Sequence, residues 1–226
     1  MNPGTPWMDW NAAALSVRLA LSGVALLAPL AIALAWPLAY GRFRGKVVLE
    51  AALLMPLVLP PTVLGFYLLQ FFGPRSALGR IWDVLTGGTL VFSFSGLLLA
   101  ILVINLPFFL QPLVASLGGV DRRLLEASAT LGHGRISTYL RVALPLSWRG
   151  LLAGAILAFA HAIGEFGVVL MVGGNLPGRT RTLSIALFDQ VQAFELEAAH
   201  RTALALMVFA FLVLLATAWL RSREPR

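Results

Sequence analysis

The sequence lacks cysteine and is poor in charged residues. None of its 226 residues is Cys, which excludes disulfides, thiolate nucleophiles, iron–sulfur clusters and Cys-based zinc sites. Only 12% of the residues are charged, whereas roughly a quarter are charged in a typical soluble domain. The chain therefore has too few polar side chains to cover a core with a water-facing surface.

Signatures of nucleotide and metal chemistry are missing as well. Only three residues separate Gly41 from Gly45, and Val47 follows Lys46 where a P-loop has Ser or Thr. The sequence contains no His-Glu-x-x-His pair, no catalytic-triad spacing and no cluster of metal ligands. We therefore expect a chain that is not itself an enzyme and that binds no cofactor or metal.

Long hydrophobic runs are what the sequence has in abundance. Hydrophobic residues make up 59% of the chain, and the mean hydropathy is +0.86. A bilayer core about 30 Å thick needs about 20 apolar helical residues to cross it. The segments that qualify are approximately residues 12–40, 47–72, 90–115, 146–172 and 202–220. We predict an all-α polytopic membrane protein with five spans, forming a single domain over residues 1–226.

The distribution of Lys and Arg orients these predicted spans. Eleven of the 17 basic residues fall in the first loop, in the loop between spans three and four, and in the C-terminal tail. They are Arg42, Arg44, Lys46, Arg122, Arg123, Arg135, Arg141, Arg149, Arg221, Arg223 and Arg226. Because cytoplasmic loops are rich in Lys and Arg, we predict an N-terminus outside and a C-terminus in the cytoplasm. The same asymmetry accounts for much of the net charge of +7, so we expect no nucleic-acid partner.

The segment 118–145, between the third and fourth predicted spans, is long, charged and patterned. Asp121 is a suitable N-cap for a short helix, and Gly132 and Gly134 can take the left-handed backbone that ends one. The residues on its predicted apolar face are Leu124, Leu125, Ser128 and Leu131. A second short helical run is predicted over 136–142. Periodicity alone leaves two readings open, which are a helix that docks in a groove on a partner and a helix that lies on the membrane surface.

The same segment resembles the EAA motif of ABC importer permeases. That motif reads Glu-Ala-Ala, three residues, Gly, nine residues, Ile, one residue, Leu-Pro. This chain keeps every spacing, with Ser128 in place of the second Ala and Val142 in place of Ile. The resemblance implies a type I ABC importer permease with the MetI-like fold, whose coupling helix is held by a cytosolic ATPase subunit. The ATPase-coupling residues that it assigns are Glu126, Ala127, Ser128, Leu131, Gly132, Val142, Leu144 and Pro145.

Further runs resemble the molybdate permeases. Residues 57–69 (LVLPPTVLGFYLL) are similar to the second-span signature of that group, and residues 164–167 and 173–183 are similar to the molybdate and sulfate permeases. The resemblance implies molybdate import, with tungstate or sulfate as alternative cargo. A passive anion channel or a structural membrane subunit is the alternative from another class.

The implied partners are a second copy of the chain, two cytosolic ABC ATPase subunits that bind ATP and Mg, and a periplasmic or extracellular molybdate-binding protein. The implied location is the bacterial inner membrane, where lipid surrounds the spans.

Helix-breaking and polar residues inside the spans predict a translocation path or gate. Prolines in a membrane helix free backbone groups that neighbouring helices or a cavity must satisfy. Glu165 is the acid deepest within a predicted span, and His161 precedes it by four residues, on the same face of a continuous helix. A gate position and a packing hydrogen bond to His161 both remain open for this acid. The candidates are Pro60, Pro61, Thr62, Gly65, Asn105, Pro107, Gly164, Glu165, Phe166 and Gly167.

The glycine-rich polar segment 173–182 lies on the predicted outer side. Glycine turns with free N–H groups, joined by Arg, can hold an oxyanion. We expect instead an ordinary outer loop that contacts a binding protein. The outer-loop candidates are Gly173, Gly174, Asn175, Thr180 and Thr182.

Small residues recur at fourfold spacing on the fourth predicted span, at Gly150, Gly154 and Ala158. Such a stripe lets two membrane helices approach closely. We predict that it packs against a neighbouring span.

Overall fold

The computed structural model describes residues 8–222, and no β-strand occurs in that range. The predicted domain covers residues 1–226, so its ends, with Arg223 and Arg226 of the predicted cytoplasmic tail, lie outside the described residues. The helices are α1 (Trp10–Tyr40), α2 (Lys46–Leu54), η1 (Met55–Leu57), α3 (Pro61–Phe72), α4 (Ala77–Thr86), α5 (Phe94–Gly118), α6 (Arg122–Thr130), α7 (Arg135–Thr138), the π-helix η2 (Tyr139–Ala143), α8 (Leu144–Leu146), α9 (Trp148–Gly164), α10 (Gly167–Gly173), α11 (Leu183–Gln192) and α12 (Leu196–Ser222).

Three helices, α1, α5 and α12, are long and apolar enough to cross a membrane. Two further pairs pass the same test only when each is taken as one span. These are Lys46–Leu57 with Pro61–Phe72, bent by 106°, and Arg135–Leu146 with Trp148–Gly164, bent by 72°. By length and composition the chain therefore has three to five spans. The all-helical class is confirmed, and the number five stays a prediction.

Two of the predicted spans are broken rather than merely kinked. The second breaks at residues 58–60, and Pro61 then opens α3 in the first helical turn, where its missing N–H removes no helical bond. The fourth ends as α9 at Gly164 and resumes as α10 at Gly167. The spacing predicts that Glu165 and His161 share one continuous helix. They do not, because the backbone of Glu165 is extended (φ −66°, ψ 129°).

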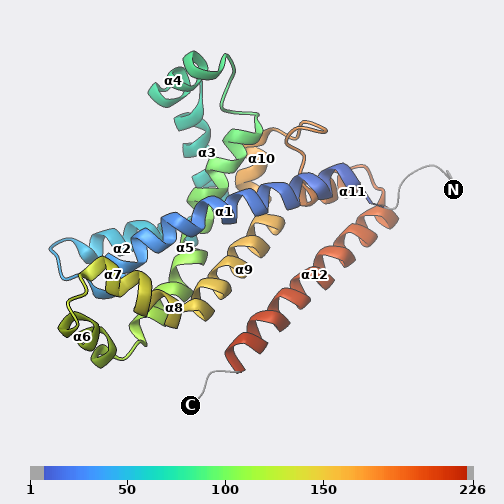
Figure 1. Cartoon of the computed structure of the whole chain (residues 1–226). Coiled ribbons are helices and arrows are strands. Elements are labelled where there is room, and N and C mark those ends of the chain that lie inside the picture. The colour runs from blue at the N-terminus through green and yellow to red at the C-terminus, as the bar shows by residue number, and fades with distance from the viewer. Residues whose placement is uncertain (1–7, 223–226) are drawn as a thin grey trace.

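Helices α1, α5 and α9 pack together and form the core of the bundle (Figure 1). The small-residue stripe of α9 makes this packing possible. A Cβ atom at Gly154 would lie 2.5 Å from the carbonyl oxygen of Phe109, and one at Gly150 would overlap Ser116, both on α5. Ala158 is 1% exposed. The predicted close approach of two spans is confirmed.

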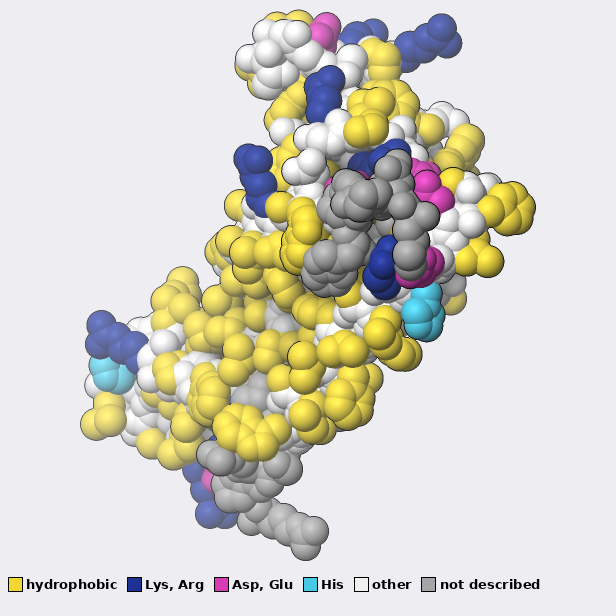
Figure 2. Space-filling view, turned by 90° about the vertical axis from the view of Figure 1, so that its right-hand side faces the viewer, with side chains coloured by type: hydrophobic (Ala, Val, Ile, Leu, Met, Phe, Trp, Pro, Cys, Tyr) yellow, Lys and Arg dark blue, Asp and Glu magenta, His cyan; other side chains and the backbone are white. Residues whose placement is uncertain are grey.

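Helix α12 lies apart from this core and contacts α9 and α11 (Figure 1). Only 11% of its apolar window is buried. Its exposed apolar side chains include Met207, Phe211, Leu212, Leu214, Leu215 and Trp219. Figure 2 shows this side of the molecule, where hydrophobic side chains cover the middle and charged side chains gather toward the ends. Such a band is the surface that a bilayer requires.

Helices α4 and α11 are short elements that the hydropathy pattern does not predict. Ser76 caps α4, because its hydroxyl accepts from the Gly79 N–H at 2.9 Å, and Gly87 ends the helix with φ +68°. Helix α4 projects from the bundle, whereas α11 lies at the end opposite to α6 (Figure 1). The third predicted span also starts late, at Phe94, because Ser93 caps α5.

Candidate functional site

The segment that resembles the EAA motif forms a helical hairpin of α6 and α7. The Asp121 carboxylate accepts from the Arg123 N–H at 2.9 Å and caps α6, as predicted. Gly132 follows the helix with φ +85°, a backbone conformation that favours glycine. Gly134 was expected to be left-handed too, but its φ of −68° and ψ of 165° are extended, and it precedes α7.

Buried hydroxyls hold this hairpin closed and tie it to the bundle. Ser128 Oγ and Thr138 Oγ1 lie 2.9 Å apart and join α6 to α7. The hydroxyl of Tyr139 donates to the Ile32 carbonyl of α1 at 2.6 Å. Ser128, where the motif has Ala, thus gains a partner that alanine could not bind. The sequence pattern misses Thr138 and Tyr139 as parts of this site, because their partners lie on other helices.

The hairpin leaves an apolar tip uncovered. Leu131 is 78% exposed, Ile136 is 76% exposed and Leu140 is 50% exposed. The prediction of one apolar face is wrong in part, because Leu125 and Ser128 face the bundle while Leu124 and Leu131 face outward. Of the other motif positions, Glu126, Ala127, Gly132 and Pro145 are exposed, and Val142 and Leu144 are half-buried. An exposed apolar tip of this kind is suited to a partner's groove.

The two broken spans meet where they are broken. Helix α3 packs against α10. A Cβ atom at Gly65 would lie 2.9 Å from Met171 Cβ, and one at Gly167 would lie 2.8 Å from Pro61 Cβ. Glycine at both positions therefore permits the contact. Pro61, Gly65 and Gly167, which were selected separately from the sequence, come together at one place.

Glu165 has a structural role at the second break. Its Oε1 accepts from the Val168 N–H at 2.9 Å and so caps α10, while Oε2 lies 3.9 Å from His161 Nε2. Its backbone carbonyl accepts from Ser184 Oγ of α11 at 2.6 Å. The side chain is nearly buried, at 8% exposure of the residue. The carboxylate thus replaces the backbone partner that Val168 loses where the helix is interrupted.

A buried amide links this break to α5. His161 Nδ1 and Asn105 Oδ1 lie 2.8 Å apart, and the imidazole stacks on Phe108 with 3.9 Å between ring centroids. Asn105 is fully buried, and its Nδ2 has no hydrogen-bond partner within residues 8–222. Pro107 lies buried on the same helix. Asn105 on α5, His161 on α9 and Glu165 in the break before α10 therefore form a chain of polar groups.

The remaining path candidates lie around the breaks. Pro60 and Thr62 are exposed at the start of α3. The Phe166 ring packs on Phe188 of α11, with centroids 5.0 Å apart. A Cβ atom at Gly164 would meet no atom within 4 Å. The space beside Gly164 and the exposed start of α3 leave room at this part of the bundle.

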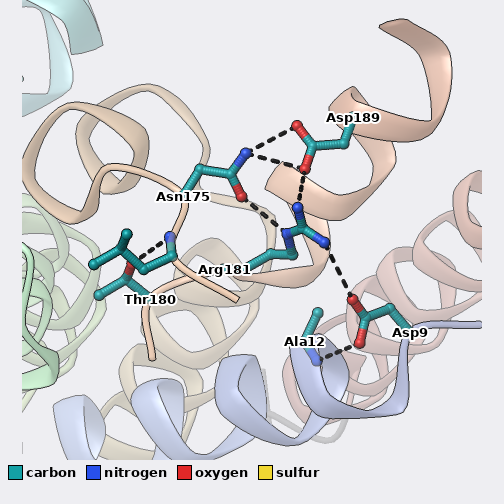
Figure 3. A network of polar contacts seen from close by, with 7 residues as sticks. Asp9, Ala12, Asn175, Thr180, Arg181 and Asp189 are labelled. Carbon is teal, nitrogen blue, oxygen red and sulfur yellow. Dashed lines mark hydrogen bonds and ion pairs between the residues drawn. The ribbon is translucent and has the colours of Figure 1, made fainter. Parts of the chain in front are cut away.

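The loop of residues 173–182, for which the sequence predicts an outer position, closes on itself through Arg181 (Figure 3). The Arg181 guanidinium donates to Asn175 Oδ1 at 2.9 Å, pairs with Asp189 at 2.8 Å, and lies 4.0 Å from an Asp9 oxygen. The Asn175 amide in turn donates to both carboxylate oxygens of Asp189 at 3.0 Å. Two carboxylates therefore already neutralise this guanidinium.

The hydroxyls of the same loop are also satisfied. Thr180 Oγ1 accepts from the Leu176 N–H at 2.9 Å and donates to the Gly173 carbonyl at 2.7 Å, and Thr182 Oγ1 lies 3.0 Å from Ser184 Oγ. Gly174 and Asn175 turn the chain with positive φ. An oxyanion would have to displace these internal bonds, so the geometry favours an ordinary ordered loop. Sequence spacing could not reveal Asp9 and Asp189 as its partners, because they come from other helices.

Replacement of Glu165 tests its capping role. Glu165→Ala removes the acceptor of the Val168 N–H, and loss of such a cap costs about 1 kcal/mol. Glu165→Gln keeps an acceptor oxygen, so its thermal unfolding midpoint in detergent should stay near that of the unaltered chain, while the midpoint of Glu165→Ala falls. An equal fall in both variants would show that the charge matters and the cap does not.

Replacement of Arg181, with replacement of Arg179 as the control, tests the structural role of the ion pairs in loop 173–182. Arg181→Ala leaves Asp189 without its guanidinium partner, and we expect a loss of about 1 kcal/mol in unfolding free energy, since the pair is partly exposed. Arg179→Ala is the control, because Arg179 is exposed and no ion pair of it occurs among the described residues. Thermal unfolding in detergent measures both. Equal midpoints for the two variants would contradict a structural role for the Arg181 network.

Comparisons with known proteins agree with this geometry. The family of binding-protein-dependent transport system inner membrane components matches residues 28–225. The chain is 45% identical over 208 residues to the molybdenum transport system permease protein ModB of Azotobacter vinelandii, with 92% of each chain covered. It is 37% identical over 220 residues to ModB of Escherichia coli (strain K12), with 96% of each chain covered. A probable sulfate transport system permease protein of Chlorella vulgaris is 30% identical over 206 residues, which cover 91% of this chain and 77% of that one.

Solved structures with the same fold are more distant in sequence. A bacterial ABC transporter involved in the import of the acidic polysaccharide alginate aligns with a TM-score of 0.72 at 15% identity, covering 95% of this chain and 79% of that chain. The fold is therefore that of an importer permease, and the apolar helices span the inner membrane more than once. The chain belongs to the family of inner-membrane components of binding-protein-dependent transport systems.

Proposed function

We propose that this chain is the permease subunit of an ATP-driven ABC importer that moves molybdate across the cytoplasmic membrane by alternating access. The observation that carries the proposal is the α6–α7 hairpin, which keeps the full EAA spacing and exposes an apolar tip. The relatives named as molybdenum permeases supply the cargo. At 45% and 37% identity they are more similar to this chain than the 30% identical sulfate permease, which favours molybdate over sulfate.

Energetics favour an ATP-driven partner over a passive channel. Molybdate is a dianion, and moving two charges inward against about 100 mV, negative inside, costs roughly 4.6 kcal/mol. A passive pore would exclude this ion from the cytoplasm rather than concentrate it. The chain has no P-loop of its own. A separate ATPase subunit, which binds ATP and Mg, is the consistent source of energy.

The hairpin is the proposed contact with that ATPase. Its apolar tip, around Leu131, would enter a groove on the ATPase, and Tyr139 would pass the motion to α1 through its hydroxyl. Each chain carries one such hairpin, and two nucleotide-binding subunits need two of them. We therefore infer a homodimer of this chain with two ATPase subunits. The apolar surface of α12, which the bundle leaves uncovered, is available to the second copy or to lipid.

Five spans fit this assembly, with an outer N-terminus and a cytoplasmic C-terminus. Each bent pair would count as one span. The hairpin and the Arg181 loop lie at opposite ends of the bundle, as this orientation requires. In a solved complex with 14% identity and a TM-score of 0.69, an alginate transporter binds a periplasmic protein that carries an alginate pentasaccharide. By analogy, the outer loop of residues 173–182 would contact a molybdate-binding protein.

The translocation path would run beside the two breaks. The start of α3, with Pro60, Pro61 and Thr62, and the break at Gly164–Gly167 are supported by the α3–α10 contact and by the open space next to Gly164. Broken helices at membrane depth are tolerated where they line a cavity or are buried in protein. Asn105 and Glu165 would hold the break in one arrangement, so that rocking of the spans opens one side at a time.

Uptake into vesicles tests the cargo and the energy source together. Proteoliposomes that hold the permease, its ATPase and its binding protein should accumulate molybdate only with ATP, and a tenfold excess of sulfate should compete weakly. Uptake that is equally fast without ATP would favour the passive channel. Preferred uptake of sulfate or tungstate would overturn the assignment of the cargo.

Two glycines of the hairpin test the coupling role. Gly132→Ala places a side chain at φ +85°, a backbone conformation that costs a non-glycine residue about 1 kcal/mol or more. The change should distort the tip, so the rate of molybdate uptake and the substrate-stimulated rate of ATP hydrolysis should both fall. Gly134→Ala is the matched control, since its φ is −68° and a Cβ there meets no atom within 4 Å. If both variants transport at the same rate as the unaltered chain, the hairpin does not couple ATP to transport.

A further inference from the structure

A basic pocket lies at the start of α6, away from the hairpin tip. Its volume is about 430 Å³, within the usual range for small-ligand sites. Three cations line it, Arg42, Lys46 and Arg122, together with a single carboxylate, Glu126. The remaining wall is made by Ala39, Tyr40, Gly41 and Leu125. The pocket therefore joins the end of α1, the start of α2 and the start of α6, and it has an excess of positive charge.

The two arginines of this pocket are free to bind an anion. Lys46 Nζ lies 3.7 Å from Glu50 Oε1, so this cation is partly compensated. No carboxylate pairs with Arg42 or Arg122 within the part of the chain that the structure describes. The hydroxyl of Tyr40 is already occupied, because it donates to the Leu117 carbonyl at 2.6 Å. Among the described residues, the unpaired groups of the pocket are thus the guanidinium donors of Arg42 and Arg122, which fit a phosphate, and the single carboxylate of Glu126, which the three cations outnumber.

The surroundings of the pocket point to lipid. Phe43 is 44% exposed, Val47 is 76% exposed and Val48 is 72% exposed, all next to the pocket along the chain. The pocket also follows directly on α1, a helix long enough to span the membrane. Cations at the end of a span with uncovered apolar side chains beside them are placed at headgroup level.

The hairpin tip is a separate surface. Leu131 caps the far end of α6, which has nine residues and is therefore about 13 Å long, and Ile136 lies on α7. A partner held at the apolar tip need not fill the basic pocket at the other end. The excess of cations with exposed apolar neighbours favours a phospholipid over an acidic protein side chain.

We propose that this pocket binds the phosphate headgroup of an anionic phospholipid of the cytoplasmic leaflet, with Arg42 and Arg122 as the main ligands. The acyl chains would lie along Val47 and Val48 at the start of α2. A lipid bound here touches both α1 and α6, and so it would brace the base of the coupling hairpin. This inference rests on the cytoplasmic orientation proposed above.

Lipid binding to the full chain tests the site. Native mass spectrometry in neutral detergent would compare dioleoyl phosphatidylglycerol with dioleoyl phosphatidylcholine. We expect the first to bind at least tenfold more tightly. Each of Arg42→Gln and Arg122→Gln should weaken phosphatidylglycerol binding by about fivefold, and the double variant by about 30-fold.

Arg44→Gln is the matched control, because Arg44 lies in the same loop but does not line the pocket. Its affinity should stay within about twofold of the unaltered chain, since its charge acts only through solvent. An equal loss in Arg44→Gln would show a diffuse attraction to anionic lipid and would overturn the site. Unchanged binding in the double variant would overturn it too.

Two further measurements distinguish a phospholipid from the other possible occupants of the pocket, which are a free oxyanion and the ATPase subunit. If millimolar inorganic phosphate displaces phosphatidylglycerol, the pocket takes free oxyanions and the lipid proposal fails. If addition of the ATPase subunits abolishes lipid binding, the pocket belongs to the protein interface and the proposal fails for the assembled transporter. Retained binding in both arms supports it.

Orientation is checked separately, because the chain has no cysteine. An Arg44→Cys variant has one thiol, which a membrane-impermeant reagent should reach only from the cytoplasmic side. Labelling from outside would reject the proposed topology, whatever the lipid result. Cytoplasmic labelling without selective lipid binding would reject the lipid site alone.

Discussion

The structure depends on how it satisfies the backbone groups that are freed where two apolar segments are interrupted, at residues 58–60 and 165–166. A bilayer offers no water for an interrupted helix, so each N–H and carbonyl at the break needs a protein partner. The Glu165 carboxylate supplies one partner, because it accepts from the Val168 N–H, and the Ser184 hydroxyl supplies another, because it donates to the Glu165 carbonyl. At the first break Pro61 removes the need, since it has no N–H. The glycines that allow α3 and α10 to touch then bring the two breaks together.

Polar side chains also stabilise the two ends of the bundle. At one end Arg181 and its carboxylates order the outer loop, and at the other the hydroxyls of Ser128, Thr138 and Tyr139 order the hairpin. Between them, on the face that carries α12, the surface is mostly apolar (Figure 2). The hairpin is tied to α1 by the Tyr139 hydroxyl, and α1 packs against α5 and α9. Force applied at the hairpin would then reach the breaks through packed helices rather than through loops.

Much of the architecture could be predicted from the sequence because hydropathy and spacing are local properties. The apolar runs locate α1 and α5 to within four residues and α12 to within six, and the EAA spacing locates the hairpin with Asp121 as its cap. Hydropathy and residue type did not predict the short helices or the backbone conformation of every glycine. Helices α4 and α11 are too short for a hydropathy window. For α4, the capping residue Ser76 and the terminating Gly87 are the sequence signals that could have revealed the helix. Gly132 and Gly134 both follow the predicted end of α6, yet of these two glycines Gly132 alone has a positive φ.

The sequence by itself determined the all-helical membrane class, the family motif and the interruption at Pro60 and Pro61, since these follow from composition and from neighbours along the chain. It did not reveal the break at Glu165. The tertiary structure alone decided which break faces which, that Glu165 caps a helix beside His161, and that Arg181 is paired with Asp9 and Asp189. Asp9, Arg181 and Asp189 come from separate segments of the chain, and their ion pairs depend on distances that only folding creates. The contacts of Glu165 are local in sequence, but the cap forms only because the helix is interrupted after Gly164.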